Sequence, residues 1–133
     1  MITGNCLCGT VAWQLDGTID LINYCHCTMC RKVHGAPFGA FAHAHASGFR
    51  WLRGESSVTC FESSPNVFRC FCPKCGSSVP VIEDDEVCIP AGSINGDPGA
   101  RPSIHIFVAS KAPWYEIADT LPQHDGFPPA EKW

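Results

Sequence analysis

Positive charge is scarce in this sequence. Lysine and arginine together number 9, against 13 aspartates and glutamates, and the formal net charge is −4 at pH 7. The basic residues that come closest to forming a cluster are Arg31, Lys32, Arg50 and Arg53. They are too few for the basic face that neutralises phosphates, so the composition excludes a general nucleic-acid binder.

Long apolar segments are missing as well. No stretch is long and apolar enough to span a membrane, and the opening residues, MITGNCLCG, contain no apolar run preceded by positive charge. We therefore expect no membrane partner, no secretory signal and a cytoplasmic location. The sequence also lacks the motifs of phosphate loops, dinucleotide sites and nucleophile elbows, which leaves metal–thiolate chemistry.

Cysteine, by contrast, is abundant, with 10 residues in a chain of 133. A chain of this length forms one domain and can bury a core without disulfides. In a reducing compartment, clustered cysteines are more often metal ligands than disulfides. The cysteine spacing is therefore the first place to look for function.

The stretch Tyr24–Phe38, YCHCTMCRKVHGAPF, places Cys25, Cys27 and Cys30 within six residues. Three thiolates suit zinc, and an incomplete ligand shell would leave a position for water or substrate. The alternative is a structural site whose fourth ligand comes from a distant part of the chain. His34, four residues after Cys30, could also be the fourth ligand. The adjacent pair Arg31 and Lys32 would hold an anion near the metal.

A second metal site is predicted from FCPKCG, residues 71–76. C-P-x-C-G is a zinc knuckle, whose turn directs backbone N–H groups at the first sulfur and supplies two ligands, here Cys72 and Cys75. Cys6 and Cys8 form the matching pair, since residues two apart on an extended strand face one side. The four would make a closed structural site.

Several other residues receive simpler interpretations. Cys60, Cys70 and Cys88 are expected to be free, small buried hydrophobes, although Cys70 could compete for the knuckle metal. His43 and His45 share a strand face but lack a third ligand, and His26 should point away from Cys25 and Cys27. His105 is expected to make a structural hydrogen bond within a strand. Trp51 and Trp114 are expected to lie in the core.

Short extended segments separated by turn residues predict a mainly β fold of antiparallel strands with little helix. Val11 to Leu15 should form a half-buried strand, and Met29–Val33 a helical turn ended by Gly35. Gly92–Arg101 should be a long turn, and the chain from Leu121 onward irregular and on the surface. The remaining predicted strands are Ile19–Tyr24, Phe38–His45, Phe49–Leu52, Val58–Glu62, Val67–Phe71, Val79–Ile82, Val87–Ile89 and Ile104–Val108.

Four blocks in order, GNCLCGTVAW, YCHCTMCRKVHGAPF, FCPKCGSSV and HIFVASKAPW, resemble the glutathione-dependent formaldehyde-activating enzymes, whose domain is shared with centromere protein V. The resemblance runs from Gly4 to about Pro128. It implies a single domain over residues 1–133 with a zinc-binding β-tent fold and up to two zinc ions. The structural ligands would be Cys6, Cys8, Cys72 and Cys75, and the catalytic ones Cys25, Cys27 and Cys30.

The activity that the resemblance implies is addition of glutathione to formaldehyde, which in reverse is a carbon–sulfur lyase reaction. Arg31 or Lys32 could then pair with a glutathione carboxylate. Two alternatives stay open. The chain could act on another small thiol or aldehyde, or it could be a non-catalytic zinc-binding interaction module.

Overall fold

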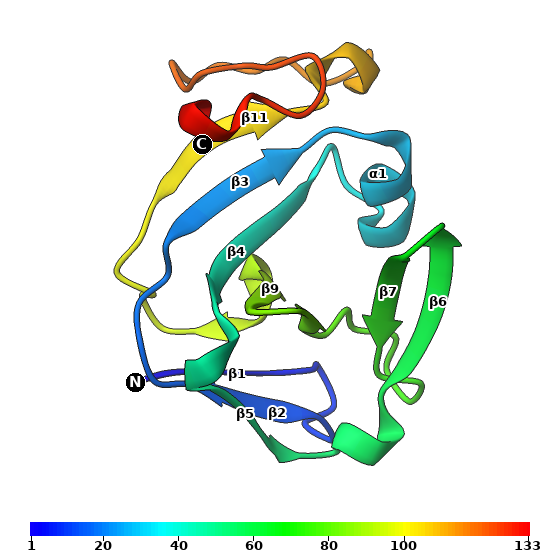
Figure 1. Cartoon of the computed structure of the whole chain (residues 1–133). Coiled ribbons are helices and arrows are strands. Elements are labelled where there is room, and N and C mark those ends of the chain that lie inside the picture. The colour runs from blue at the N-terminus through cyan, green and yellow to red at the C-terminus, as the bar shows by residue number, and fades with distance from the viewer.

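Eleven strands in three sheets and one short α-helix make up the protein, as shown by a computed structural model that describes residues 1–133 (Figure 1). The four-stranded sheet has the order β10 (Ile94–Asn95), β1 (Ile2–Asn5), β2 (Ala12–Leu15) and β5 (Phe49–Arg53). The five-stranded sheet has the order β11 (Pro102–Ile106), β3 (Leu21–Cys25), β4 (Gly39–His45), β9 (Glu86–Pro90) and β8 (Val81–Glu83). The third sheet is the hairpin of β6 (Thr59–Ser64) and β7 (Val67–Phe71).

Helical structure is confined to α1 (Thr28–His34) and five single turns of 3-10 helix. These turns are Ala46–Gly48, Glu55–Ser57, Ala91–Ser93, Val108–Ser110 and Ala130–Lys132. No helix is long and apolar enough to cross a membrane. The prediction of a mainly β fold with little helix is confirmed.

One strand pair departs from the predicted antiparallel arrangement. β11 runs parallel to β3, with His105 opposite Tyr24 and Ile106 opposite Cys25. Parallel neighbours need a long connection, and here almost the whole intervening chain supplies it. On its other side β3 pairs antiparallel with β4, where Gly39 lies opposite Cys25. The end of β3 that carries Cys25 is therefore held between two strands.

The largest core cluster lies between the four-stranded and five-stranded sheets and includes Trp13, Leu15 and Ile89. Every residue of β2 is buried, so the prediction of a half-buried strand is wrong. Gln14 is tolerated there because its amide donates to the Asp16 carboxylate at 3.0 Å. Gly4 is required opposite Trp13, because a Cβ at Gly4 would come within 2.1 Å of the indole.

The predicted helical turn is confirmed and extends one residue further at each end, as α1. Cys27 is its N-cap, and the Cys27 sulfur accepts a hydrogen bond from the backbone N–H of Cys30 at 3.3 Å. Gly35 ends the helix in the left-handed conformation, with φ of 58°, which glycine adopts without a steric penalty. The helix cap thus belongs to the cysteine cluster itself.

Cys60 and Cys70 form a disulfide across β6 and β7, so the prediction that both are free thiols is wrong. The two residues face each other directly in the strand register, with a Cα–Cα distance of 4.0 Å. Pairing across a hairpin could not be read from spacing alone. The bond ties together the hairpin that stands beside α1 in Figure 1.

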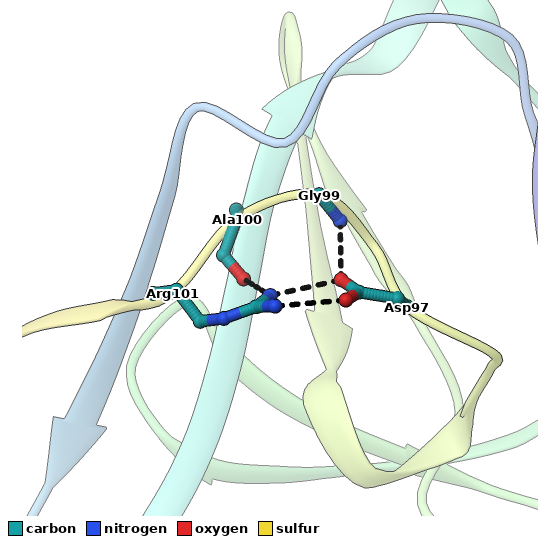
Figure 2. A network of polar contacts seen from close by, with 4 residues as sticks. All are labelled: Asp97, Gly99, Ala100 and Arg101. Carbon is teal, nitrogen blue, oxygen red and sulfur yellow. Dashed lines mark hydrogen bonds and ion pairs between the residues drawn. The ribbon is translucent and has the colours of Figure 1, made fainter.

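The segment Gly92–Arg101 is a turn as predicted, but it also contains the short strand β10. Its later part is closed by the Asp97 carboxylate, which accepts two hydrogen bonds from the Arg101 guanidinium and one from the Gly99 N–H, each at 2.8 Å (Figure 2). The Arg101 hydrogen bonds lower the pKa of Asp97. The pair is exposed, so its role is to shape the loop before β11.

The C-terminal tail follows the outer edge of β11 (Figure 1). The backbone N–H of His105 donates to Pro122 O at 2.9 Å, and the His124 N–H donates to His105 O at 3.0 Å. The tail is therefore irregular on the surface, as predicted, yet attached to the sheet. Trp114 is 69% exposed, so the prediction of a core position for it is wrong, whereas Trp51 packs against the core.

Candidate metal centres and the adjoining cavity

Cys6, Cys8, Cys72 and Cys75 come together from two distant parts of the chain, with their sulfurs all within 4.8 Å of one another. The Cys6 and Cys8 sulfurs are 3.7 Å apart, and those of Cys8 and Cys72 are 3.8 Å apart. A tetrahedral zinc with bonds of about 2.3 Å separates its sulfur ligands by about 3.8 Å. These spacings fit a zinc site with four cysteine ligands.

Backbone and hydroxyl groups support this four-sulfur cluster. The Val11 N–H donates to the Cys6 sulfur at 3.3 Å, and Gly76 turns the knuckle with φ of 77°. The Ser77 hydroxyl lies 3.3 Å from the Cys75 sulfur, and this hydrogen bond lowers the Cys75 pKa to about 5. A thiol with a lowered pKa is available as the thiolate that a metal needs.

The second cluster consists of Cys25 at the end of β3, the N-cap Cys27, and Cys30 in the first turn of α1. Their sulfurs also lie within 4.8 Å of one another. The Cys25 hydrogen bond lowers the pKa of Cys27, and the same contact raises the pKa of Cys25. Three sulfurs this close hold protons between them unless a cation neutralises their charge. The donor set therefore fits a soft metal such as zinc.

His26 points away from this cluster, as the extended spacing predicts. Its Nε2 lies 2.8 Å from His105 Nδ1, and His105 Nε2 lies 2.9 Å from the Asp119 carboxylate. Both rings are completely buried. Burial lowers the pKa of His26 to about 4, so the ring is neutral at pH 7. His105 is thus structural, as predicted, and anchors the loop between Cys25 and Cys27.

Arg69, on β7, is the residue at this site that the sequence did not reveal. Its guanidinium donates to the Cys30 sulfur at 3.4 Å, and its Nε donates to the Ser63 hydroxyl at 3.1 Å. Arg69 is separated from Cys30 by 39 residues and belongs to no motif. It places a fixed positive charge against the three-sulfur cluster.

A cavity of about 390 Å³ opens beside the three-sulfur cluster. All three sulfur-bearing residues lie on its wall, together with Arg69 and His34. Of the 24 residues that line it, 16 are hydrophobic. The cluster therefore faces a space large enough for an organic ligand.

The other predicted site residues lie around this cavity in different ways. His34 is on the wall, but its ring nitrogens do not belong to the group of ligand atoms that gather within 4.8 Å, which consists of the three sulfurs. Arg31 and Lys32 do not line the cavity, although both belong to α1. His43 bonds to Glu86 and Asn23, and His45 caps a turn through Ser47.

The chain is similar to a described protein family and to a solved structure. A family model described as "Glutathione-dependent formaldehyde-activating enzyme" matches residues 1–110. A crystal structure of a Rhodobacter sphaeroides protein shares the fold, with a TM-score of 0.59 and 22% sequence identity, over 71% of this chain and 89% of that chain. No curated protein matches the chain significantly.

Proposed function

The chain belongs to the glutathione-dependent formaldehyde-activating enzyme family. We propose that it joins a small thiol such as glutathione to a small aldehyde. In the reverse direction, it would split this adduct as a carbon–sulfur lyase. The observation that carries this proposal is the three-sulfur cluster without a fourth protein ligand, facing a cavity. A structural metal site is closed by its ligands, whereas a reactive one keeps a position open.

The reaction needs little beyond a thiolate and an aldehyde held together. The thiolate sulfur attacks the carbonyl carbon, a carbon–sulfur bond forms, and the carbonyl π electrons move to oxygen, which takes up a proton. Cys25, Cys27 and Cys30 would hold zinc, whose charge lowers the pKa of a thiol or polarises a carbonyl. Cys6, Cys8, Cys72 and Cys75 would hold a second zinc with a structural role.

We assign different tasks to the three basic residues near the cluster. Arg69 contacts the cluster and lies on the cavity wall, where its charge favours thiolate over thiol. Arg31 and Lys32 lie outside the cavity on α1, where they could meet a carboxylate of a thiol that extends beyond its mouth.

The protein is expected to speed the exchange between free glutathione and its formaldehyde adduct by at least about tenfold over the spontaneous rate, since holding two reactants in the right geometry alone can contribute more than this. NMR exchange spectroscopy measures both rates in one sample. Cys27→Ser should return the rate to the spontaneous value. Cys27→His, which restores a zinc ligand, should recover part of it. A Cys27→Ser protein as fast as the wild type would contradict the proposal.

Metal analysis should find two zinc ions in each chain, released in two phases. The three-sulfur cluster should lose its metal to a mild chelator first, because it has fewer ligands and opens on a cavity. The four-sulfur cluster should release zinc only with unfolding, which circular dichroism follows in parallel. Release of both ions in a single phase, or a Cys6–Cys8 disulfide in reduced protein, would contradict this assignment.

A further inference from the structure

The cavity beside the three-sulfur cluster has more apolar wall than formaldehyde can use. We infer that it receives an aldehyde with an apolar substituent, which the protein handles as its glutathione adduct. This inference rests on the proposed function and concerns the substrate class of the same site. Three features of the cavity carry it, namely the scarcity of charge on its wall, the apolar residues from the C-terminal tail, and the apolar residues from α1 and the β6–β7 hairpin.

Charge on the cavity wall is nearly absent. Arg69 is the only lysine or arginine that lines it, Glu83 is the only acid, and Arg69 already donates to Cys30 and Ser63. Glutathione carries two carboxylates and an ammonium group, and buried charges need partners. Its charged ends must therefore stay at the mouth or in solvent. The volume of the cavity is then available for the group attached to the glutathione sulfur. Formaldehyde adds only a hydroxymethyl group there.

One apolar wall comes from the C-terminal tail. Phe127 and Trp133 both line the cavity, and the Phe127 ring lies 4.7 Å from that of Phe107 and 6.5 Å from that of Trp133. Phe127 is nevertheless 75% exposed and Trp133 44% exposed. Both lie beyond residues 1–110, the part that matches the family model. This part of the lining therefore lies outside the region that matches the family model.

A second set of apolar lining residues comes from α1 and the β6–β7 hairpin. Met29 and Val33 of α1 and Val67 and Phe68 of β7 all line the cavity, and all are between 36% and 43% exposed. Soluble proteins seldom gather partly exposed apolar side chains around one hollow without a ligand to cover them. The cavity that holds the reactive sulfurs is therefore lined by apolar side chains from two separate parts of the chain. This lining suits an aromatic or branched aliphatic substituent.

Binding can be measured without turnover by using unreactive thioethers as stand-ins for the adduct. S-benzylglutathione carries an aromatic group where the adduct carries its substituent, and S-methylglutathione carries almost nothing there. By calorimetry on the zinc-loaded protein, S-benzylglutathione should bind at least about tenfold more tightly, as expected for burial of an aromatic ring. Equal affinities, or no binding of either compound, would overturn the inference.

Substitutions in the C-terminal tail test whether its aromatic residues cause the preference for S-benzylglutathione. Trp133→Ala and Phe127→Ala should each remove most of the advantage of the benzyl compound and leave binding of S-methylglutathione within about twofold, because only the apolar contact is lost. Trp114→Ala is the matched control, since Trp114 is 69% exposed and does not line the cavity. Equal weakening of both compounds by Trp133→Ala would show that the tail supports the fold and not the ligand.

Turnover separates this inference from the proposed function. Phenylacetaldehyde should be used with a kcat/KM at least about tenfold above that of formaldehyde, with glutathione as the thiol, and Trp133→Ala should lower only the former. A protein that handles formaldehyde but gains nothing from the phenyl group would retain the proposed function and lose the inference. Selective binding of the benzyl compound without any turnover would retain the inference about what the cavity binds and contradict the proposed function.

Discussion

Replacing Cys75 by serine is expected to prevent the protein from folding. The four-sulfur cluster joins the chain near β1 and β2 to the knuckle after β7, and zinc binding at such a site contributes directly to the free energy of folding. A structural zinc supplies on the order of 10 kcal/mol, which is as much as the whole stability of a small domain. Circular dichroism and thermal melting in the presence of zinc measure the loss.

Cys27→Ser is the matched control, because it removes one sulfur from the other cluster. That variant should keep a cooperative thermal transition and the far-ultraviolet spectrum of the wild type. Cys27 is the N-cap of a single seven-residue helix, and the serine hydroxyl can accept the same capping hydrogen bond, so the substitution should cost the fold little. If the two variants were equally destructive, the division into a structural and a reactive centre would be wrong.

Replacing Arg69 by alanine is expected to weaken zinc binding at the three-sulfur cluster by roughly 10- to 100-fold, the usual effect of losing a group that hydrogen-bonds to a metal ligand. Three thiolates and one zinc ion leave a net negative charge, and the guanidinium 3.4 Å from the Cys30 sulfur offsets it. Competition with a coloured chelator measures the affinity.

Two further variants make the Arg69 result specific. Arg101→Ala removes an arginine that bonds only within its own exposed loop, to Asp97 and Ala100, so zinc affinity should not change (Figure 2). Arg69→Lys keeps the positive charge but loses the paired donors of the guanidinium. Its zinc affinity should therefore lie between that of the wild type and that of Arg69→Ala. Unchanged affinity in Arg69→Ala would show that the arginine serves the hairpin through Ser63 alone.

The cysteine clusters could be predicted from the sequence because their geometry is largely local. Cys25, Cys27 and Cys30 are brought together by one strand end and one helix turn, and Cys72 and Cys75 by one knuckle. Only the pairing of Cys6 and Cys8 with the knuckle required a long-range inference, and counting ligands was enough for it. The end of α1 at Gly35 follows from the preference of glycine for the left-handed conformation.

Arg69, Phe127 and the Cys60–Cys70 disulfide could not be predicted, because each depends on how segments pair or attach in the folded chain. Cys60 faces Cys70 only in the observed pairing of β6 with β7, and a shift of one residue would turn the side chains of a strand to its other face. Phe127 reaches the cavity because the tail attaches to His105 and its neighbours on β11. Nothing in the local sequence specifies either arrangement.

The parallel pairing of β3 with β11 has a consequence for how fast the protein folds. His26 and His105, which meet beside these strands, are 79 residues apart, and Asn5 meets Asn95 across 90 residues. Contacts between such distant residues lose loop-closure entropy before they gain stability, so a topology of this kind forms slowly. These contacts also form only once nearly the whole chain has been synthesised. Zinc held by the four-sulfur cluster would link Cys8 to Cys72 across 64 residues, and so offset part of the loop-closure entropy of this topology.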